Sequence, residues 1–440
     1  MKRKIYTDLL KWKKNPAKKP LLLQGARQVG KTYIVNQFGK NEYSNYIYLN
    51  FEQEKTLKTF FEGSLNSQSL IENIALYLGR KIESKDTLIF FDEIQEVPRA
   101  ITSLKYFHEQ IPELHILAAG SLLGVSVGKK HSFPVGKVNF LSLYPLSFSE
   151  FLGAAGEAPL QDLIDKGELR NLADPIHEKL IGLFKKYLYL GGMPEVLAHY
   201  FKHQDIEAAR NIQLELLKAY ERDFSKYTDK NQTIKTSEVW NSIPYQLAKE
   251  SKKFKYSDVK KKARAAHYEQ TIEWLKGAGL IYVVYNVSTP KIPISGYADR
   301  SKFKIYLFDT GLLGALLNLP SSVIITADKL FEDYNGAFIE NYAAVELNAN
   351  NINNLFYWTS KSDAEVDFVI QKNLQIIPIE IKSGTSLNTK SIRSYAKKYA
   401  PEFIVRSSPR NYEHRDDFFN LPLYWLSRVL ELEGYNGITE

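Results

Sequence analysis

Apolar and polar positions follow two different patterns along the chain. In the first third, short apolar runs of strand length alternate with segments of helical periodicity; the runs lie at 21–23, 46–51, 88–91 and 115–119, and the helical segments at 33–38, 69–78 and 100–110. Strands that alternate with helices predict a parallel sheet with crossover helices. Because ligands of such sheets bind at the carboxyl ends of the strands, we expect a binding site at that edge.

After about residue 145 the pattern is mostly helical, over 147–228. Residues 236–308 then predict three short helices followed by two strands, an arrangement typical of winged-helix DNA-reading modules. A helical stretch follows over 330–350, and strands are expected at 355–359, 364–371 and 375–382. The last two strands are joined by a hairpin-like turn. The second half therefore predicts a helical region and a further α/β domain.

Composition narrows the class of protein. Of 440 residues, 44% are hydrophobic and 25% are charged, which is typical of a globular protein and excludes wholesale disorder. No apolar run approaches the roughly 20 residues of a spanning helix, and no secretion signal is expected. The chain has no cysteine, which excludes disulfides, thiolate zinc sites and cysteine nucleophiles. We expect a cytoplasmic protein without a membrane partner.

Charge adds a candidate partner. The formal net charge is +8, and much of the excess is local: residues 1–20 and 249–264 each hold eight basic side chains. Such runs favour a polyanion, and DNA in particular, as partner. On the helix expected to read DNA, contacts would come from His267, Tyr268, Gln270 and Lys276. The alternatives are that the runs are solvated faces and that the winged helix is a scaffold.

A phosphate-binding motif follows the first predicted strand. The pattern G-x-x-x-x-G-K-[ST] is matched at every position and opens the next predicted helix. Backbone N–H groups of such a loop surround phosphate oxygens, its lysine neutralises the β- and γ-phosphates, and its threonine hydroxyl ligates Mg²⁺. We therefore predict a site for ATP and Mg²⁺ at Gly25, Ala26, Arg27, Gln28, Val29, Gly30, Lys31 and Thr32.

A second motif completes this site. The apolar strand 88–91 delivers Asp92 and Glu93 to its carboxyl end. Asp92 is expected to hold Mg²⁺ and Glu93 to polarise the attacking water. The strand at 116–119 leads to Ser121, a candidate catalytic contact to the γ-phosphate; the alternative is that Ser121 caps a helix.

The terminal region carries a carboxylate–lysine pattern. Asp367 lies on one strand of the expected hairpin and Glu380 and Lys382 on the next, so that alternation predicts all three on one face, with Glu340 approaching from the preceding helix. Carboxylates collect a hard divalent cation, and the lysine can activate water. This D…ExK pattern resembles the PD-(D/E)XK nucleases. We expect a metal site at Glu340, Asp367 and Glu380; a structural ion pair is the alternative.

Several motifs together resemble a known family. GARQVGKT, LIFFDEIQEVP, AAGSLLGV, LYPLSFSEF and YLGGMPEVL are similar to motifs of bacterial and archaeal AAA-type ATPases. The resemblance implies four regions: an AAA-type P-loop ATPase domain at 1–150, a helical region at 151–235, a winged helix at 236–320 and a restriction-endonuclease-like domain at 321–440.

At one position where the family carries an arginine that could contact ATP, this chain has a different residue. Relatives usually carry arginine before the LYPLSF-like stretch, whereas this chain has Lys137, which cannot make the bidentate contact. Arg222, in the segment YERD, also matches a family motif and is the second candidate for a γ-phosphate contact. A surface salt bridge is the alternative at both positions.

The sequence thus predicts an α/β protein that binds and hydrolyses ATP with Mg²⁺, engages DNA and carries a nuclease-like terminal domain. Two alternatives stay open. One is a nucleotide-dependent switch whose winged-helix and terminal domains only bind DNA or a protein partner. The other is a phage-defence or toxin-like effector nuclease. Self-association as a homo-oligomer also stays open.

Overall fold

The computed structural model describes residues 1–83, 85–120, 133–249, 251–321, 335–360, 364–384 and 388–433. The chain divides into two compact units. The first comprises Met1–Tyr144 together with the short segment Gly277–Leu280, and the second comprises Pro145–Lys276 and Ile281–Glu440.

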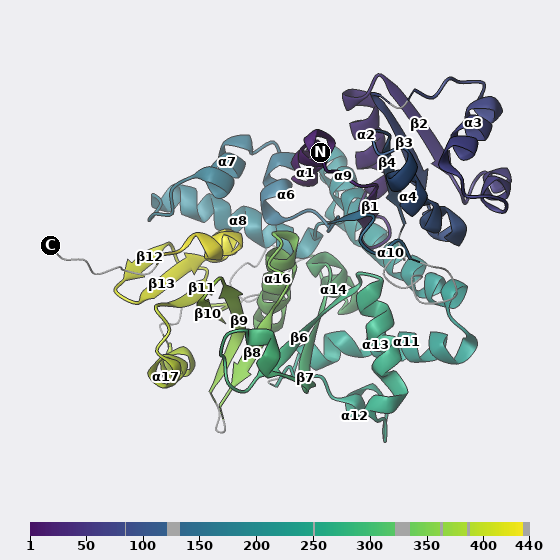
Figure 1. The fold of residues 1–440 in the computed structure, drawn as a ribbon. Helices are drawn as coiled ribbons and strands as arrows, with labels where there is room; N and C mark the ends of the chain where they lie inside the picture. The colour runs from purple at the N-terminus through teal and green to yellow at the C-terminus, as the bar shows by residue number, and fades with distance from the viewer. Residues whose placement is uncertain are drawn as a thin grey trace. The chain divides into compact units, whose positions relative to one another are not determined.

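The first unit contains a five-stranded sheet in which neighbouring strands are parallel (Figure 1). The strand order is β2-β3-β4-β1-β5. The strands are β1 (Leu21–Gln24), β2 (Asn45–Asn50), β3 (Thr87–Asp92), β4 (His115–Ala119) and β5 (Asn139–Ser142), and the helices are α1 (Ile5–Lys14), α2 (Lys31–Glu42), α3 (Ser67–Leu78) and α4 (Pro98–Gln110). The α/β class predicted for this part of the chain is confirmed.

Burial explains why β3 ends at the site. All six residues of this strand are buried, because it lies between β2 and β4 and both of its faces are covered. Ile89 and Phe91 of this strand pack in one core with Leu104 and Phe107 of α4. The strand ends at Asp92, so its carboxylate lies at the carboxyl end of a buried strand.

The second unit begins with helices, as the pattern over 147–228 predicts. They are α6 (Phe148–Ala154), α7 (Ala158–Lys166), α8 (Asp174–Leu190), α9 (Pro194–His203), α10 (Ile206–Tyr227), α11 (Lys230–Leu247), α12 (Tyr256–Val259) and α13 (Ala265–Gly277). A reciprocal capping box between Ser147 and Glu150 starts α6, because each side chain satisfies a backbone N–H group of the other residue.

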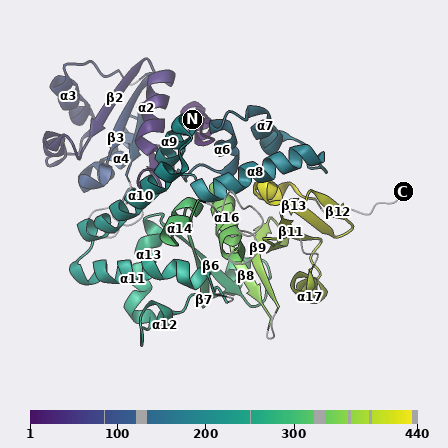
Figure 2. The ribbon, with the colours of Figure 1, turned by 180° about the vertical axis from the view of Figure 1, so that it is seen from behind.

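A mixed sheet of eight strands follows in the order β12-β13-β11-β10-β9-β8-β6-β7 (Figures 1 and 2). The strands are β6 (Ile281–Val287), β7 (Ala298–Leu307), β8 (Phe356–Thr359), β9 (Glu365–Lys372), β10 (Gln375–Ile381), β11 (Ile404–Ser408), β12 (Glu413–Arg415) and β13 (Phe418–Pro422), and the helices are α14 (Thr310–Leu316), α16 (Asn335–Ala349) and α17 (Lys390–Tyr399). Helix α16 packs against β7 and β10, and α17 packs against β9 and β10.

The strands expected as the wing belong to this larger sheet. β6 pairs with β7 in antiparallel fashion and also with β8 in parallel fashion. One sheet therefore contains strands from both sides of the domain boundary that the sequence predicts between residues 320 and 321: β6 and β7 before it, and β8 to β13 after it. Pairing between strands this far apart in the sequence is invisible to local patterns.

Candidate functional site

The phosphate loop connects β1 to α2 in the first unit. Gly25 has φ +145°, and a Cβ atom there would lie 2.2 Å from the carbonyl oxygen of Leu143. Gly30 has φ +96°, and Gln28 also adopts a positive φ of 63°. Because side chains disfavour this backbone region, the two glycines are required for the loop to turn back on itself and open α2.

Lys31 is the first residue of α2 and is nearly fully buried. Its Nζ donates to the carbonyl oxygens of Gly25, at 2.9 Å, and Ala26, at 2.7 Å. Burial lowers the pKa of Lys31 to about 8, although the carboxylates of Glu93 and Asp92 act to raise it. A buried ammonium group whose partners in the described part of the chain are two carbonyl oxygens favours an anionic ligand, because an anion would compensate its lost hydration.

Asp92 joins the two sequence motifs. Its Oδ2 accepts hydrogen bonds of 2.9 Å from the hydroxyls of Thr32 and Tyr48, and its Oδ1 accepts from the backbone N–H of Glu93. Burial raises the pKa of Asp92, while these hydrogen bonds oppose the increase. A carboxylate and a hydroxyl that meet at this distance are hard oxygen donors, so Thr32 and Asp92 fit the Mg²⁺ that the sequence predicts.

Tyr48 and Asn50 were not found from the sequence. Both lie on β2, where Asn50 is in register with Asp92, and the Asn50 amide donates to the Tyr48 hydroxyl. A signal existed in the sequence: two polar side chains two residues apart at the end of a strand face the same side. They orient the Asp92 carboxylate through the Tyr48 hydroxyl.

Glu93 follows β3 with a left-handed backbone, at φ 52°. Its Oε2 accepts a hydrogen bond of 2.5 Å from the side-chain amide of Gln95. Burial raises the pKa of Glu93, and the hydrogen bond from Gln95 opposes that increase. Gln95 is itself 9% exposed. Gln95 therefore fixes the position of the predicted catalytic carboxylate, a role that sequence reasoning missed.

Two further segments brace the loop from outside the motif. The guanidinium of Arg3 donates to the carbonyl oxygens of Val29, at 3.1 Å, and Tyr144, at 2.6 Å. In the segment Gly277–Leu280, Gly279 has φ +73°, and a Cβ atom there would lie 3.3 Å from the backbone nitrogen of Ala26. The phosphate loop is thus held by residues from both the start and the middle of the chain.

The sequence offers three further candidates for a contact to ATP. Ser121 falls outside the described residues. Arg222 is an exposed residue of α10 in the second unit. Lys137 forms an ion pair with Glu109, at 3.1 Å. The contact to the γ-phosphate that was expected from these positions stays a prediction.

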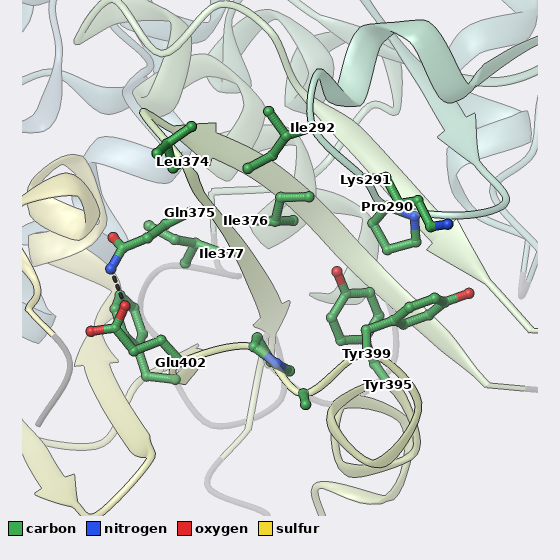
Figure 3. Close-up of a pocket in the computed structure, with 13 residues that line it drawn as sticks. Pro290, Lys291, Ile292, Leu374, Gln375, Ile376, Ile377, Tyr395, Tyr399 and Glu402 are labelled. Carbon is green, nitrogen blue, oxygen red and sulfur yellow. Dashed lines mark hydrogen bonds between the residues drawn. The ribbon is translucent and has the colours of Figure 1, made fainter.

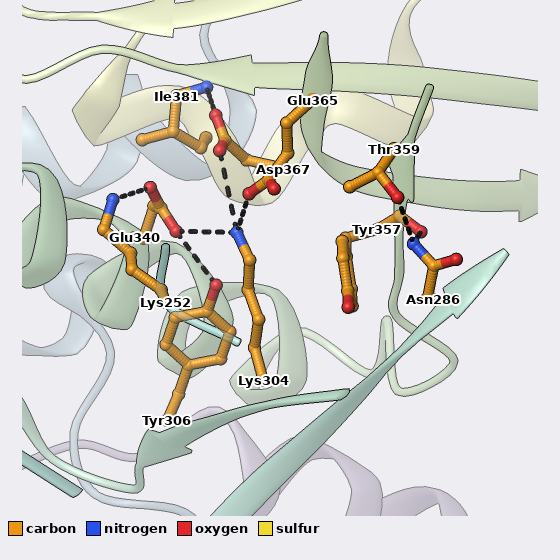
Figure 4. Close-up of polar contacts among 10 residues, drawn as sticks. All are labelled: Lys252, Asn286, Lys304, Tyr306, Glu340, Tyr357, Thr359, Glu365, Asp367 and Ile381. Atoms are coloured by element: carbon orange, nitrogen blue, oxygen red, sulfur yellow. Dashed lines mark hydrogen bonds and ion pairs between the residues drawn. The ribbon is translucent and has the colours of Figure 1, made fainter. Parts of the chain in front are cut away.

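In the second unit, Glu340 and Asp367 lie around a lysine that the sequence did not single out (Figure 4). The Nζ of Lys304 is 2.5 Å from Glu365 Oε1, 3.3 Å from Glu340 Oε2 and 3.9 Å from Asp367 Oδ1. Lys252 pairs with the other oxygen of Glu340. Within the described parts of the chain, no group of three or more acidic or histidine side chains is arranged to hold a metal ion.

Glu380 and Lys382 lie apart from that cluster. They pair with each other, at 3.0 Å, and Glu380 is in register with Arg406 of β11. The register of β9 and β10, which pairs Phe368 with Ile379, ends one residue before Asp367 and Glu380. On its other side β9 contains a bulge: Phe356 pairs with Val369 but Trp358 pairs with Val366, so β9 holds one extra residue there.

The basic segment 249–264 is partly neutralised within the chain. Lys249 pairs with Asp258, at 2.7 Å, and Lys260 pairs with Glu238, at 2.8 Å. Lys261, Lys262 and Arg264 are exposed between α12 and α13, as are His267, Gln270 and Lys276 on α13. Tyr268 is instead buried and donates to Glu238.

A separate cavity of about 360 Å³ lies beside the β9–β10 turn and the end of α17 (Figure 3). Its walls are largely apolar and aromatic, with Tyr395 and Tyr399 from α17 and Ile376 and Ile377 from β10. Gln375 and Glu402 hydrogen-bond across one side. None of the residues predicted from the sequence lines this cavity.

Comparison with protein families matches three consecutive segments. Residues 17–152 match the AAA domain, residues 181–323 match a domain of unknown function (DUF8612), and residues 335–426 match another domain of unknown function (DUF4143). The first match covers both motifs of the site, the phosphate loop and the end of β3 with Asp92 and Glu93. Residues 17–152 are therefore similar to AAA domains, which agrees with the phosphate loop and the parallel sheet of the first unit.

Individual relatives are distant. Uncharacterized proteins of Mycobacterium bovis and Mycobacterium tuberculosis are each 32% identical over 108 residues, so the chain spans about a quarter (24%) of the length of these curated relatives. Among solved structures, a Walker-type ATPase of Pyrococcus abyssi is similar with a TM-score of 0.47 and 13% identity, over 72% of this chain and 95% of that one. PCH-2 of C. elegans is similar with a TM-score of 0.27 and 15% identity, over 46% and 60%.

A search for membrane-spanning segments agrees with the composition. Among the helices of the described residues, none combines the length and the apolar character needed to cross a bilayer.

The bracing of the phosphate loop can be tested at Gly279. Gly279→Ala forces a side chain into a left-handed backbone, at a cost of about 1–2 kcal/mol, and brings its Cβ against Ala26. We expect weaker ATP binding, measured by calorimetric titration. Gly63→Ala is the control, because a Cβ atom there meets nothing within 4 Å. Equal ATP affinity of the two variants would show that the turn does not support the loop.

Proposed function

We propose that this protein binds ATP at the phosphate loop, hydrolyses it with Mg²⁺, and couples its nucleotide state to DNA bound by the segment that leads into α13. The hydrogen bond between Thr32 and Asp92 carries the proposal. This hydrogen bond brings the hydroxyl of the phosphate loop next to the carboxylate at the end of β3. One Mg²⁺ ion held by both groups requires them to be this close.

The roles follow from the contacts. Backbone N–H groups of the loop and the ammonium group of Lys31 bind the phosphates, and Thr32 and Asp92 would hold Mg²⁺, which neutralises charge on the β- and γ-phosphate oxygens. Glu93 accepts a proton from the attacking water, and Gln95 orients its carboxylate. Burial keeps bulk water from weakening these interactions.

Lys31→Ala and Glu93→Gln separate binding from turnover. Lys31→Ala removes the buried ammonium group, so ATP binding should be lost. Glu93→Gln keeps the shape of the site but removes the base, so ATP should still bind while hydrolysis falls by about 10²–10⁴-fold. Binding is measured with a fluorescent ATP analogue and turnover by phosphate release. Wild-type turnover in Lys31→Ala would refute the assignment of the site.

Gln95→Ala tests the positioning of the base through its pH dependence. The hydrogen bond from Gln95 favours the charged form of Glu93, so its removal should raise the pKa of Glu93. Because the reaction needs the ionised carboxylate, the acidic limb of kcat should move to higher pH. A shift of about one pH unit or more is expected, since a hydrogen bond to a charged group contributes about 1.5–3 kcal/mol.

The control for this experiment is Glu96→Gln, a change at the neighbouring residue, whose carboxylate pairs with Lys58. ATP affinity should stay unchanged in both variants. A Gln95→Ala enzyme with a lower kcat at every pH and an unmoved acidic limb would contradict the positioning role and leave only a structural one.

DNA binding is supported by the cations without internal partners. Lys261 and Lys262 are exposed, and within the described residues they form no ion pair, unlike Lys260. Changing both to Glu should weaken DNA binding and reduce the slope of log affinity against log salt concentration by about 0.9 for each phosphate that the variant no longer neutralises. Binding is followed by fluorescence anisotropy over a range of salt concentrations.

Lys302→Glu serves as the comparison, because Lys302 also lies at the surface but is paired with Asp299, at 3.0 Å. It should leave the salt slope unchanged. If the double variant also keeps the wild-type salt slope, the segment 249–264 is a solvated face and does not bind DNA.

A physical route for coupling between ATP and DNA exists in the chain itself. Helix α13 up to Lys276 and strand β6 belong to the second unit, whereas the last residue of α13, Gly277, and the three residues that follow it, 278–280, belong to the first. Gly279 there packs against Ala26 of the phosphate loop. We therefore propose that this turn transmits movements of the loop to α13.

The terminal region has two candidate roles, DNA cleavage and binding alone. Cleavage with a metal ion requires carboxylate oxygens that are open to the metal. The ion pairs of Lys304 favour the second role, a domain that only binds DNA or a protein partner. These ion pairs also carry the inference that follows.

A further inference from the structure

Three carboxylates of the second unit converge on one ammonium group (Figure 4). Lys304 lies on β7 and its side chain is fully buried. Its Nζ is 2.5 Å from Glu365, 3.3 Å from Glu340 and 3.9 Å from Asp367. These acids come from α16 and from β9, and the one nearest in sequence, Glu340, is 36 residues from Lys304. The lysine ammonium group thus lies within 4 Å of all three carboxylates.

The remaining oxygens of Glu340 and Asp367 also have partners. Lys252 pairs with Glu340 Oε1, and the hydroxyl of Tyr306 donates to Glu340 Oε2, at 3.0 Å. Asp367 Oδ2 accepts a hydrogen bond of 2.8 Å from the backbone N–H of Ile381. A divalent cation would have to displace an ammonium group or a backbone hydrogen bond to gain access to either carboxylate.

Displacement of Lys304 is unfavourable. Its ammonium group also lies 5.2 Å from the centre of the Tyr357 ring, and its side chain has no exposed surface. Moved away from the carboxylates, the charge would stay inside the protein without partners, and an isolated buried charge is far more costly than a paired one. The cation at the centre of this cluster is therefore part of the fold.

Glu380 has a lysine partner of its own. Pairing between β9 and β10 keeps one register from Lys372 and Gln375 to Phe368 and Ile379 and ends there, one residue before Asp367 and Glu380. Glu380 pairs with Lys382, at 3.0 Å. Each carboxylate of the predicted metal site, at Glu340, Asp367 and Glu380, thus lies within 4 Å of a lysine ammonium group of the same chain.

We propose that Lys304 supplies, from within the chain, the cation that Glu340, Glu365 and Asp367 require, so that this cluster binds no divalent metal ion and the terminal domain does not cleave DNA by a metal-dependent route. The residues present do not fit the metal that a nuclease of this pattern needs. The inference uses no property of the phosphate loop, so it stands or falls independently of ATP hydrolysis.

The test measures Mn²⁺ binding to the full-length protein without nucleotide, by the electron paramagnetic resonance signal of free Mn²⁺. The wild type and Asp367→Asn should bind equal amounts, because any metal held near Thr32 and Asp92 is common to both. Lys304→Met removes the internal cation but keeps much of the side-chain volume. It should gain a Mn²⁺ site, and the double variant Lys304→Met, Asp367→Asn should lose that site again.

Lys302→Met is the matched control, since this lysine lies on the same strand but is exposed and paired with Asp299. It should bind Mn²⁺ as the wild type does. Mn²⁺ binding by the wild type that Asp367→Asn removes would overturn the proposal, and so would a folded Lys304→Met variant that gains no Mn²⁺ site. If Lys304→Met does not fold, the comparison of wild type with Asp367→Asn decides alone. Plasmid nicking that needs Mn²⁺ and is lost in Asp367→Asn would overturn the proposal as well.

Discussion

The buried ammonium group of Lys304 sets the strongest constraint on the second unit. A charge without exposed surface must be neutralised where it lies, so β7, α16 and β9 have to meet at one point. Removal of one partner from a buried ion pair destabilises a protein by about 3–5 kcal/mol, because the other charge stays buried. The same contacts explain why the two strands after α13 are part of the terminal sheet rather than a separate wing.

The pKa of a second buried lysine, Lys31, is shifted in the opposite direction from that of Lys304. Lys304 is surrounded by carboxylates, which raise its pKa well above the ordinary value, although burial alone would lower it. Among the described residues, the hydrogen-bond partners of the Lys31 ammonium group are the carbonyl oxygens of Gly25 and Ala26, and burial lowers its pKa to about 8. The first ammonium group is already neutralised, whereas the second gains stabilisation from an anion. Of these two lysines, Lys31 is therefore the one suited to a phosphate ligand.

The sequence predicted the first unit far better than the second, for a physical reason. The phosphate loop and the strand ending at Asp92 are local patterns, because a short apolar run followed by two acids marks the carboxyl end of a buried parallel strand. The surroundings of Asp367 depend instead on contacts from distant segments, because Lys304 of β7 and the backbone N–H of Ile381 both approach its carboxylate. Lys304 was not predicted because its partners Glu340 and Glu365 come from distant segments, and no local pattern marks a lysine as buried.

The turn from Gly277 to Leu280 shows how two local requirements combine into one constraint. Two separate requirements favour glycine at position 279. Its backbone is left-handed, and a side chain there would approach the backbone nitrogen of Ala26. That nitrogen belongs to the loop whose N–H groups are expected to bind phosphate. Because the turn is continuous with α13 on one side and β6 on the other, the loop cannot shift past Gly279 without moving the ends of both elements or deforming the turn between them. A four-residue segment with two glycines is soft enough to deform, so the stiffness of this turn decides how much of any loop movement reaches α13.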